Sequence, residues 1–220
     1  MTKWFRGWMV ALLLLPAAPA AWAAQDAASV QAAQAVVKQA ANQALKALHE
    51  QSKAELAKPA AVHKLVSQYI LPVVDIQASA RLVLGHYWRT ATPAQRTAFV
   101  EQFKELLIRT YSKSISEYPD SKIEYLSNRD TSDGRFATVH TRVMPPGHEP
   151  ITVDYSLFKT NVGWKVYDLT ISGLSLVQSY RSTFAEEIQQ TSLDALIKRL
   201  TQQNQAQAQV NAQSPGKAGS

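Results

Sequence analysis

Residues 137–143 read Ala-Thr-Val-His-Thr-Arg-Val, and residues 151–158 read Ile-Thr-Val-Asp-Tyr-Ser-Leu-Phe. Within each stretch every second residue is apolar or β-branched, which is the period of a strand with one buried face. Residues 164–171 carry apolar side chains on both faces, which favours a central or doubly covered strand. Before these three stretches, Ile123 and Tyr125 alternate with charged neighbours. The pattern therefore predicts four strands.

Turn-forming residues separate the predicted strands. They are Asp133-Gly134, Pro145-Pro146-Gly147 and a loop from Asn161 to Gly163. Short turns of this kind join antiparallel neighbours, so the four strands should form an antiparallel meander.

Helical patterns lie on both sides of the strands. Residues 27–58 are rich in Ala, Gln and Lys and have no interior Gly or Pro, which favours one long helix whose alanines permit close approach to a partner element. Periodicity and helix-breaking prolines predict helices over residues 27–58, 60–71, 75–84, 92–118, 173–190 and 192–200. Helices, then strands, then helices indicate an α+β fold, with a curved four-stranded antiparallel sheet packed against several helices.

The strongest helix start is Thr92-Pro93-Ala94-Gln95. The Thr92 side chain can accept from the backbone amide of Gln95, and the Gln95 side chain can reach back to Thr92. Pro93 suits the first helical position because its missing amide hydrogen is not needed there. We expect this helix to end near Tyr118.

The N-terminus has the pattern of a secretory signal peptide. Lys3 and Arg6 form a short basic region, residues 8–15 are unbroken apolar, and Ala21-Trp22-Ala23 supplies the small-x-small pattern that signal peptidase reads. A membrane anchor is the weaker alternative, because the apolar run is far short of the ~20 residues that span a bilayer. We expect cleavage before Ala24 and a periplasmic mature protein.

Removal of residues 1–23 from the 220-residue chain leaves 197, enough for one domain. The 23 basic residues fall to 21 without Lys3 and Arg6, and against 17 acidic residues they give a net charge of +4. Basic residues are scattered singly, so nucleic acid is not an expected partner. We assign residues 24–202 to a single α+β domain and the apolar-poor residues 203–220 to a disordered tail.

No catalytic or metal-binding motif stands out in the sequence. The absence of cysteine excludes disulfides, thiolate zinc sites, a cysteine nucleophile and lipid attachment. The five histidines lack a ligand spacing, and the eight glycines form no phosphate-binding loop. Asp154 and Asp168 lie on neighbouring predicted strands and could act as a general acid or base, but an ion pair or hydrogen bond is the expected role of Asp168.

Three stretches resemble one known family. Residues 81–96 read Arg-Leu-Val-Leu-Gly-His-Tyr-Trp-Arg-Thr-Ala-Thr-Pro-Ala-Gln-Arg, residues 163–169 read Gly-Trp-Lys-Val-Tyr-Asp-Leu, and residues 173–188 read Gly-Leu-Ser-Leu-Val-Gln-Ser-Tyr-Arg-Ser-Thr-Phe-Ala-Glu-Glu-Ile. Together they are similar to the periplasmic phospholipid-binding proteins of the Mla lipid-transport system (the MlaC-like, or toluene-tolerance auxiliary, family). The resemblance runs in the right order from about residue 30 to residue 200.

The resemblance implies a non-enzymatic carrier that needs no cofactor and has phospholipid as its cargo. Members of the family hold acyl chains in an apolar pocket between helices and a sheet of nuclear-transport-factor-like shape. The implied partners are an inner-membrane ABC (ATP-binding-cassette) transporter complex with an MCE-domain protein and an outer-membrane lipoprotein–porin complex, and the implied role is maintenance of outer-membrane lipid asymmetry. Face alternation and this pocket position predict a lipid-binding lining of Phe103, Leu107, Tyr111, Val139, Val153, Tyr155, Val166, Leu174, Leu176 and Val177.

Two other classes of function remain open. One is an isomerase or dehydratase of the same cone-shaped class, acting on a hydrophobic substrate through Asp168. The other is a periplasmic chaperone or adaptor whose apolar surface binds protein. Periodicity alone also leaves a plain packed core open for the predicted lining, because buried apolar residues mostly serve packing.

Overall fold

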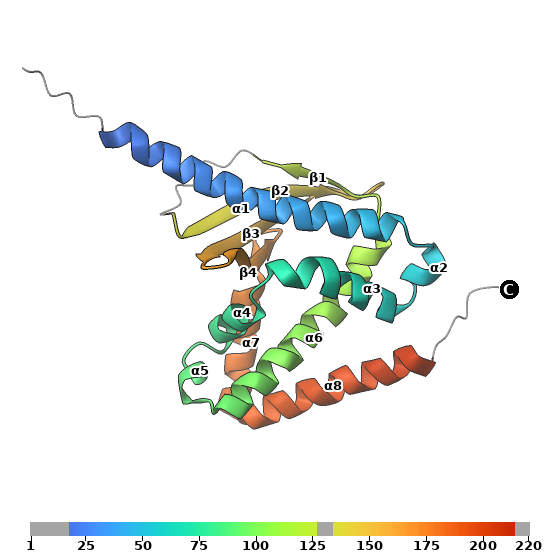
Figure 1. The fold of residues 1–220 in the computed structure, drawn as a ribbon. Helices are drawn as coiled ribbons and strands as arrows, with labels where there is room; N and C mark the ends of the chain where they lie inside the picture. The colour runs from blue at the N-terminus through green and yellow to red at the C-terminus, as the bar shows by residue number, and fades with distance from the viewer. Residues whose placement is uncertain (1–17, 127–133, 214–220) are drawn as a thin grey trace, which may run out of the picture.

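The computed structural model describes residues 18–126 and 134–213 (Figure 1). The α-helices are α1 (Ala18–His49), α2 (Lys53–Leu56), α3 (Pro59–Leu65), α4 (Ile76–Leu84), α5 (Tyr87–Thr90), α6 (Pro93–Glu117), α7 (Leu176–Gln190) and α8 (Leu193–Gln213). The strands are β1 (Lys122–Tyr125), β2 (Phe136–Met144), β3 (Ile151–Thr160), β4 (Gly163–Ile171) and β5 (Leu174–Ser175). Across the described ranges, no helix is both long and apolar enough to span a bilayer.

The sheet is an antiparallel meander in the order β1-β2-β3-β4-β5. The predicted α+β class is confirmed, but the sheet has five strands rather than four. Leu174 and Ser175, which we expected to open a helix, pair instead with the end of β4. They can do so because Ser172 (φ 48°) and Gly173 (φ 83°) adopt the left-handed backbone of a tight turn. Helix α7 consequently starts at Leu176.

Helix α1 ends at His49, whereas the composition indicated a helix up to residue 58. The earlier end is explained by Ser52, whose side chain accepts from the backbone amide of Glu55 and caps α2. A serine that satisfies an amide in this way favours a new helix start over continuation of the old one. Pro59 then opens α3 at its first position.

The expected helix over residues 60–71 is irregular. Regular α3 changes into a π-helical segment, η1 (Val66–Ile70), and then into a 3₁₀ turn, η2 (Leu71–Val73). Pro72 provides the reason, because it has no amide hydrogen and its ring clashes with the carbonyl four residues earlier in a regular α-helix. This segment packs along α1.

Helix α6 confirms the predicted capping box. The Gln95 amide donates to Thr92 Oγ1 over 3.2 Å, and the Thr92 amide donates to Gln95 Oε1 over 2.9 Å. Figure 1 shows α6 between α3 and α8, and both helices pack against it. Helix α6 is thus the central helix of the helical layer.

The structure corrects the expected end of the last helix. We expected α8 to stop near Leu200 and a disordered tail to follow from residue 203, but the helix continues to Gln213. Ala and Gln are good helix formers, and no Gly or Pro interrupts them before Pro215. The Asn204 amide nitrogen also donates to Gln102 on α6, over 2.9 Å to its side-chain oxygen. Residues 214–220 lie outside the described ranges.

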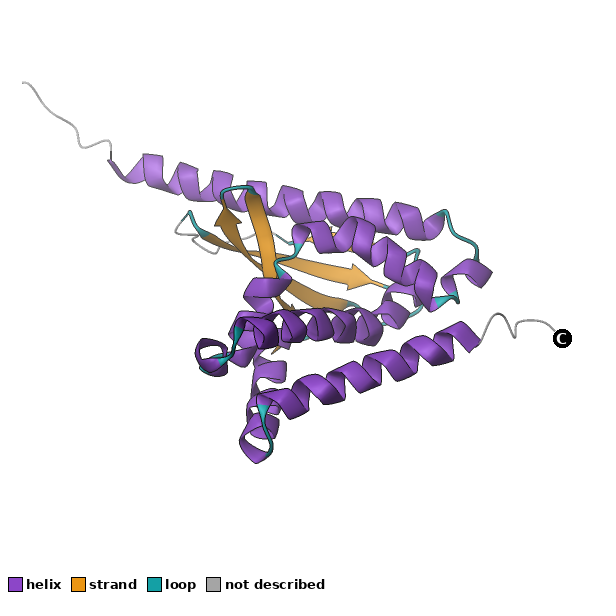
Figure 2. Ribbon diagram, turned by 60° about the horizontal axis from the view of Figure 1, so that its bottom comes forward, coloured by secondary structure: helices purple, strands orange, loops and turns teal. Residues whose placement is uncertain are grey.

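The buried apolar residues form separate clusters rather than one core. The helical cluster joins α4, α6, α7 and α8, and its largest fully buried members are Phe99 and Phe103. The sheet cluster joins α1 to β2, β3 and β4, and its buried members include Val37 of α1, Val139 and Val166. A smaller third cluster joins α3, η1 and α6. Figures 1 and 2 show α1 along the sheet and α8 on the opposite side of the molecule.

Candidate functional site

The side of the sheet that faces α1 is called here the inner face. Residues directly opposite each other in an antiparallel sheet share a face, so the registers of β1 to β4 define its members. They are Ile123, Tyr125, Ala137, Val139, Thr141, Val143, Ile151, Val153, Tyr155, Leu157, Lys159, Trp164, Val166, Leu169 and Ile171. The charged member of this set is Lys159, which is exposed near the end of β3. The rest of the inner face can bind an apolar ligand and carries no group that is charged at neutral pH.

The outer face of the same strands is different in character. Arg142 forms an ion pair with Glu124 at 3.1 Å, and His140 pairs with Asp154 at 2.8 Å. His140 is thus part of a half-buried cross-strand pair. Most charged residues of the sheet thus lie on the outer face, while the inner face is largely apolar.

Four predicted lining residues meet on the inner face. Val139 lies directly opposite Tyr155, and Val153 lies directly opposite Thr141. Val139 and Val166 are buried in the sheet cluster, while Val153 is only half-buried. The register between β3 and β4 shifts at a bulge between Ser156 and Leu157. Because of this bulge, the apolar residues of both strands lie on the same face.

The helical layer holds four more of the predicted residues. Phe103 is buried and stacks on Phe99 at 5.7 Å between ring centroids. Val177 is buried in the same cluster, and half-buried Leu107 packs against it. Tyr111, two further turns along α6 from Phe103, lies close to Tyr180 of α7. Burial, followed by the Tyr180 contact, raises the pKa of Tyr111 to about 12, so its hydroxyl stays neutral.

Two predicted residues are not brought to these surfaces. Leu174 lies on the edge strand β5 with 69% of its surface exposed and belongs to neither cluster. Leu176 is half-buried at the first position of α7 and is also outside the clusters. Both assignments depended on an unbroken helix from Gly173, which the β4–β5 turn replaces.

Sequence reasoning missed the contribution of α1 to this region. Val30, Ala33 and Val37 pack against the inner face, and Ala33 is fully buried. Their spacing of three and four residues is the signal that could have identified them. The expectation that alanines let this helix approach closely is met at Ala33.

Asp168, the candidate acid or base of the alternative hypothesis, has a structural role. Its carboxylate accepts from the amides of Leu169 at 2.8 Å and Val177 at 3.0 Å, and from the Ser175 hydroxyl at 2.6 Å. These bonds tie the end of the sheet to the start of α7. The predicted hydrogen-bonding role of Asp168 is therefore confirmed. Among residues 18–126 and 134–213, no three His, Asp or Glu side chains gather in a way that could hold a metal ion.

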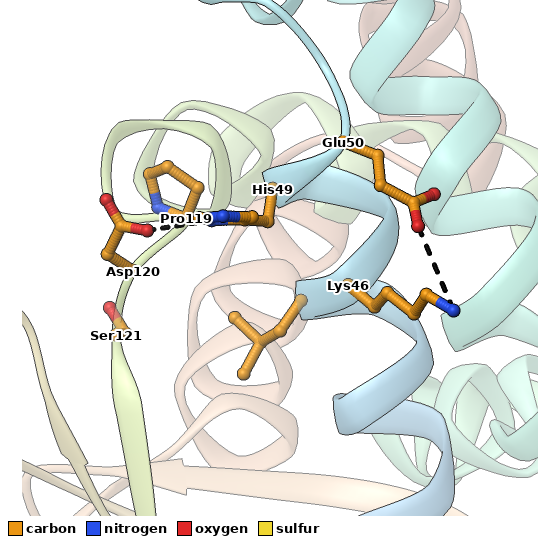
Figure 3. Close-up of a pocket in the computed structure, with 7 residues that line it drawn as sticks. Lys46, His49, Glu50, Pro119, Asp120 and Ser121 are labelled. Atoms are coloured by element: carbon orange, nitrogen blue, oxygen red, sulfur yellow. Dashed lines mark hydrogen bonds and ion pairs between the residues drawn. The ribbon is translucent and has the colours of Figure 1, made fainter.

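A hollow of about 450 Å³ lies elsewhere, at the C-terminal end of α1 (Figure 3). It is open to solvent, and Leu45 and Pro119 contribute its apolar side. His49 and Asp120 bridge it with a 2.9 Å contact between exposed side chains. It contains no residue of the inner face, so we do not assign the apolar ligand to it.

The largely apolar sheet face under α1 and the separate apolar helical layer together offer surface for an apolar ligand. Comparison with known proteins identifies the protein family. A family model described as MlaC protein matches residues 38–202, and the chain belongs to this family.

Similarity to individual proteins agrees with this family assignment. The intermembrane phospholipid transport system binding protein MlaC of Haemophilus influenzae is 26% identical over 147 residues, which are 66% of this chain and 69% of that protein. The toluene tolerance protein ttg2D of Pseudomonas putida is 29% identical over 151 residues, 68% of each chain. The phospholipid-binding protein of Ralstonia solanacearum, solved with a phospholipid, matches with a TM-score of 0.75 and 33% identity, covering 80% of this chain and 98% of that one.

Proposed function

We propose that this chain is a periplasmic, non-enzymatic phospholipid carrier of the Mla system. It takes lipid between an outer-membrane lipoprotein–porin complex and an inner-membrane ABC transporter complex with an MCE-domain protein, and so helps to maintain outer-membrane lipid asymmetry. The observation that carries the proposal is the likeness to the Ralstonia solanacearum protein solved with a phospholipid, at 33% identity over 98% of that chain. The largely apolar inner face supports it independently.

The energetics of lipid transfer explain why a carrier needs an apolar surface. Each methylene that leaves water contributes about 0.8 kcal/mol, so a ~16-carbon acyl chain exposed to water costs roughly 13 kcal/mol. Apolar walls remove most of this cost, while a polar head group can remain in solvent. A carrier therefore needs an uncharged lining and no catalytic group.

For the lining we propose the predicted residues that lie on the two apolar layers. On the inner face these are Val139, Val153, Tyr155 and Val166, and on the helical side Phe103, Leu107, Tyr111 and Val177. Lipid would enter between the helical cluster and the sheet cluster, which are separate. Leu174 and Leu176 are left out of this lining.

The direct test is extraction of the protein purified from its native host. We expect organic solvent to release phospholipid in near-stoichiometric amount, measured by mass spectrometry against protein concentration. The matched control is a periplasmic protein without an apolar binding surface, purified in parallel. Protein that carries no more phospholipid than this control would refute the carrier and return attention to the enzyme and chaperone alternatives.

Export provides a second prediction. If Ala21-Trp22-Ala23 is the cleavage site, the mature chain should start at Ala24 and fractionate with the periplasm. Intact-mass measurement checks the N-terminus. A mass that still includes residues 1–23, or persistent membrane association, would contradict the periplasmic assignment.

A further inference from the structure

One buried hydroxyl group on the inner face has no partner. The Tyr125 hydroxyl oxygen is shielded from solvent and makes no hydrogen bond to any residue within 18–126 and 134–213. A hydroxyl removed from water without a replacement partner costs free energy, and native structures contain few of them. A hydroxyl in this condition on an otherwise apolar surface points to a partner that comes from outside the chain.

The neighbouring hydroxyl of Thr141 is already engaged by another partner. Thr141, directly opposite Tyr125, donates to the carbonyl oxygen of Val153 over 2.8 Å. Thr141 also lies near Tyr155 and partly offsets the rise in the pKa of Tyr155 that burial causes. Because a hydroxyl has a single hydrogen, the hydrogen of Thr141 is engaged by Val153 and is not available to Tyr125. The hydrogen of the Tyr125 hydroxyl remains unused among the described residues.

The missing partner must accept a hydrogen bond. Burial, followed by the proximity of Tyr155, raises the pKa of Tyr125 to about 12, so the group is a neutral phenol at every physiological pH. Burial likewise raises the pKa of Tyr155 above its usual value. A neutral phenol donates best to a carbonyl or other oxygen acceptor.

Tyr125 lies where the apolar face meets solvent. It is on β1, the edge strand of the sheet, and packs against the sheet cluster. The ammonium group of Lys38, an exposed residue of α1, lies 5.8 Å from the centroid of the Tyr125 ring. The Tyr125 hydroxyl is thus buried, yet the ring that carries it lies beside a charged group at the surface. In a phospholipid the ester groups occupy the same kind of boundary, between the charged head group and the hydrocarbon chains.

We propose that Tyr125 donates a hydrogen bond to an ester carbonyl oxygen of the bound phospholipid, and that this bond fixes how deep the lipid enters. The inference rests on the proposed function and adds a specific polar contact to it. The apolar walls bind the chains, and Tyr125 recognises the linkage that joins them to glycerol. An ether-linked lipid with the same chains lacks this carbonyl and cannot form the bond.

The test compares diester and diether phosphatidylcholines with identical hydrocarbon chains, each presented in vesicles to delipidated protein. Wild-type protein should take up both, with preference for the diester. Tyr125→Phe should weaken uptake of the diester by roughly threefold to tenfold, the value of one hydrogen bond, and leave uptake of the diether unchanged. Tyr167→Phe is the matched control, because the Tyr167 ring packs with Phe136 and Phe158 on the outer face of the same sheet, and it should have no effect on either lipid.

Thermal unfolding of the lipid-free variants provides a second readout. Removal of an unpaired hydroxyl should not lower the melting temperature of lipid-free Tyr125→Phe. A lower melting temperature, or equal losses of diester and diether uptake, would overturn the proposal because the hydroxyl would then serve the fold. If wild-type protein takes up neither lipid, the proposed function itself fails and the Tyr125 proposal falls with it. Uptake of both lipids without any effect of Tyr125→Phe refutes the Tyr125 proposal alone.

Discussion

Delipidated protein should melt about 5–10 °C below the lipid-loaded form. A ligand that binds only the folded state adds about 2.7 kcal/mol when its free concentration is a hundred times its Kd. For a domain of this size each kcal/mol corresponds to roughly 2–4 °C. Readdition of phospholipid should restore the melting temperature in proportion to acyl length, because each methylene buried contributes about 0.8 kcal/mol until the apolar surfaces are covered.

Differential scanning fluorimetry of stripped protein with a homologous series of phosphatidylcholines measures this effect. Glycerophosphocholine, which has the head group without chains, is the control and should produce no rise. Equal melting temperatures for stripped, short-chain and long-chain samples would be incompatible with a lipid carrier. An enzyme for a small polar substrate would respond to its substrate but not to chain length.

The second prediction with a large expected effect distinguishes residues that line the lipid site from residues of the packed core. Leu107→Trp and Val153→Trp should reduce the phospholipid carried by purified protein several-fold, because both side chains are half-buried on the proposed lining and a larger ring there occupies the space of an acyl chain. Lipid-free stability should change little. Phe99→Ala, by contrast, removes a fully buried ring that contacts Phe103 and Phe184. This change should cost about 3–5 kcal/mol in the free energy of unfolding.

Denaturant unfolding and lipid quantification of the same three variants provide the comparison. If Leu107 and Val153 belong to a filled core, their tryptophan variants will be overpacked and lose about 1–3 kcal/mol. Such a loss without a specific decrease in lipid would remove both residues from the proposed lining.

The features that depend on local chemistry were predictable from the sequence. Strand alternation in residues 137–143 and 151–158 placed Val139 and Tyr155 correctly on one face, because side-chain direction in a strand follows from the backbone. The capping box at Thr92 was predictable for the same reason, since all its partners lie within four residues.

The missed features depend on contacts between distant segments. The continuation of α8 is supported by Asn204 and its hydrogen bonds to Gln102, which no pattern in the Gln-rich tail reveals. Leu174 was misplaced because helix and edge strand compete over two residues, and pairing with β4 decides the outcome. The unpaired state of the Tyr125 hydroxyl could not be foreseen either, since it depends on which other hydroxyls are already engaged.

The meander has a consequence for the order of folding. Because each strand pairs with its sequence neighbour, the sheet closes only short loops, and hairpins of this kind form in about 1–10 μs. Val30, Ala33 and Val37 of α1, by contrast, pack mainly against strands from the second half of the chain. A polypeptide that emerges N-terminus first therefore exposes the apolar stripe of α1 until β2 and β4 arrive. During this interval a holding chaperone has a defined segment to protect.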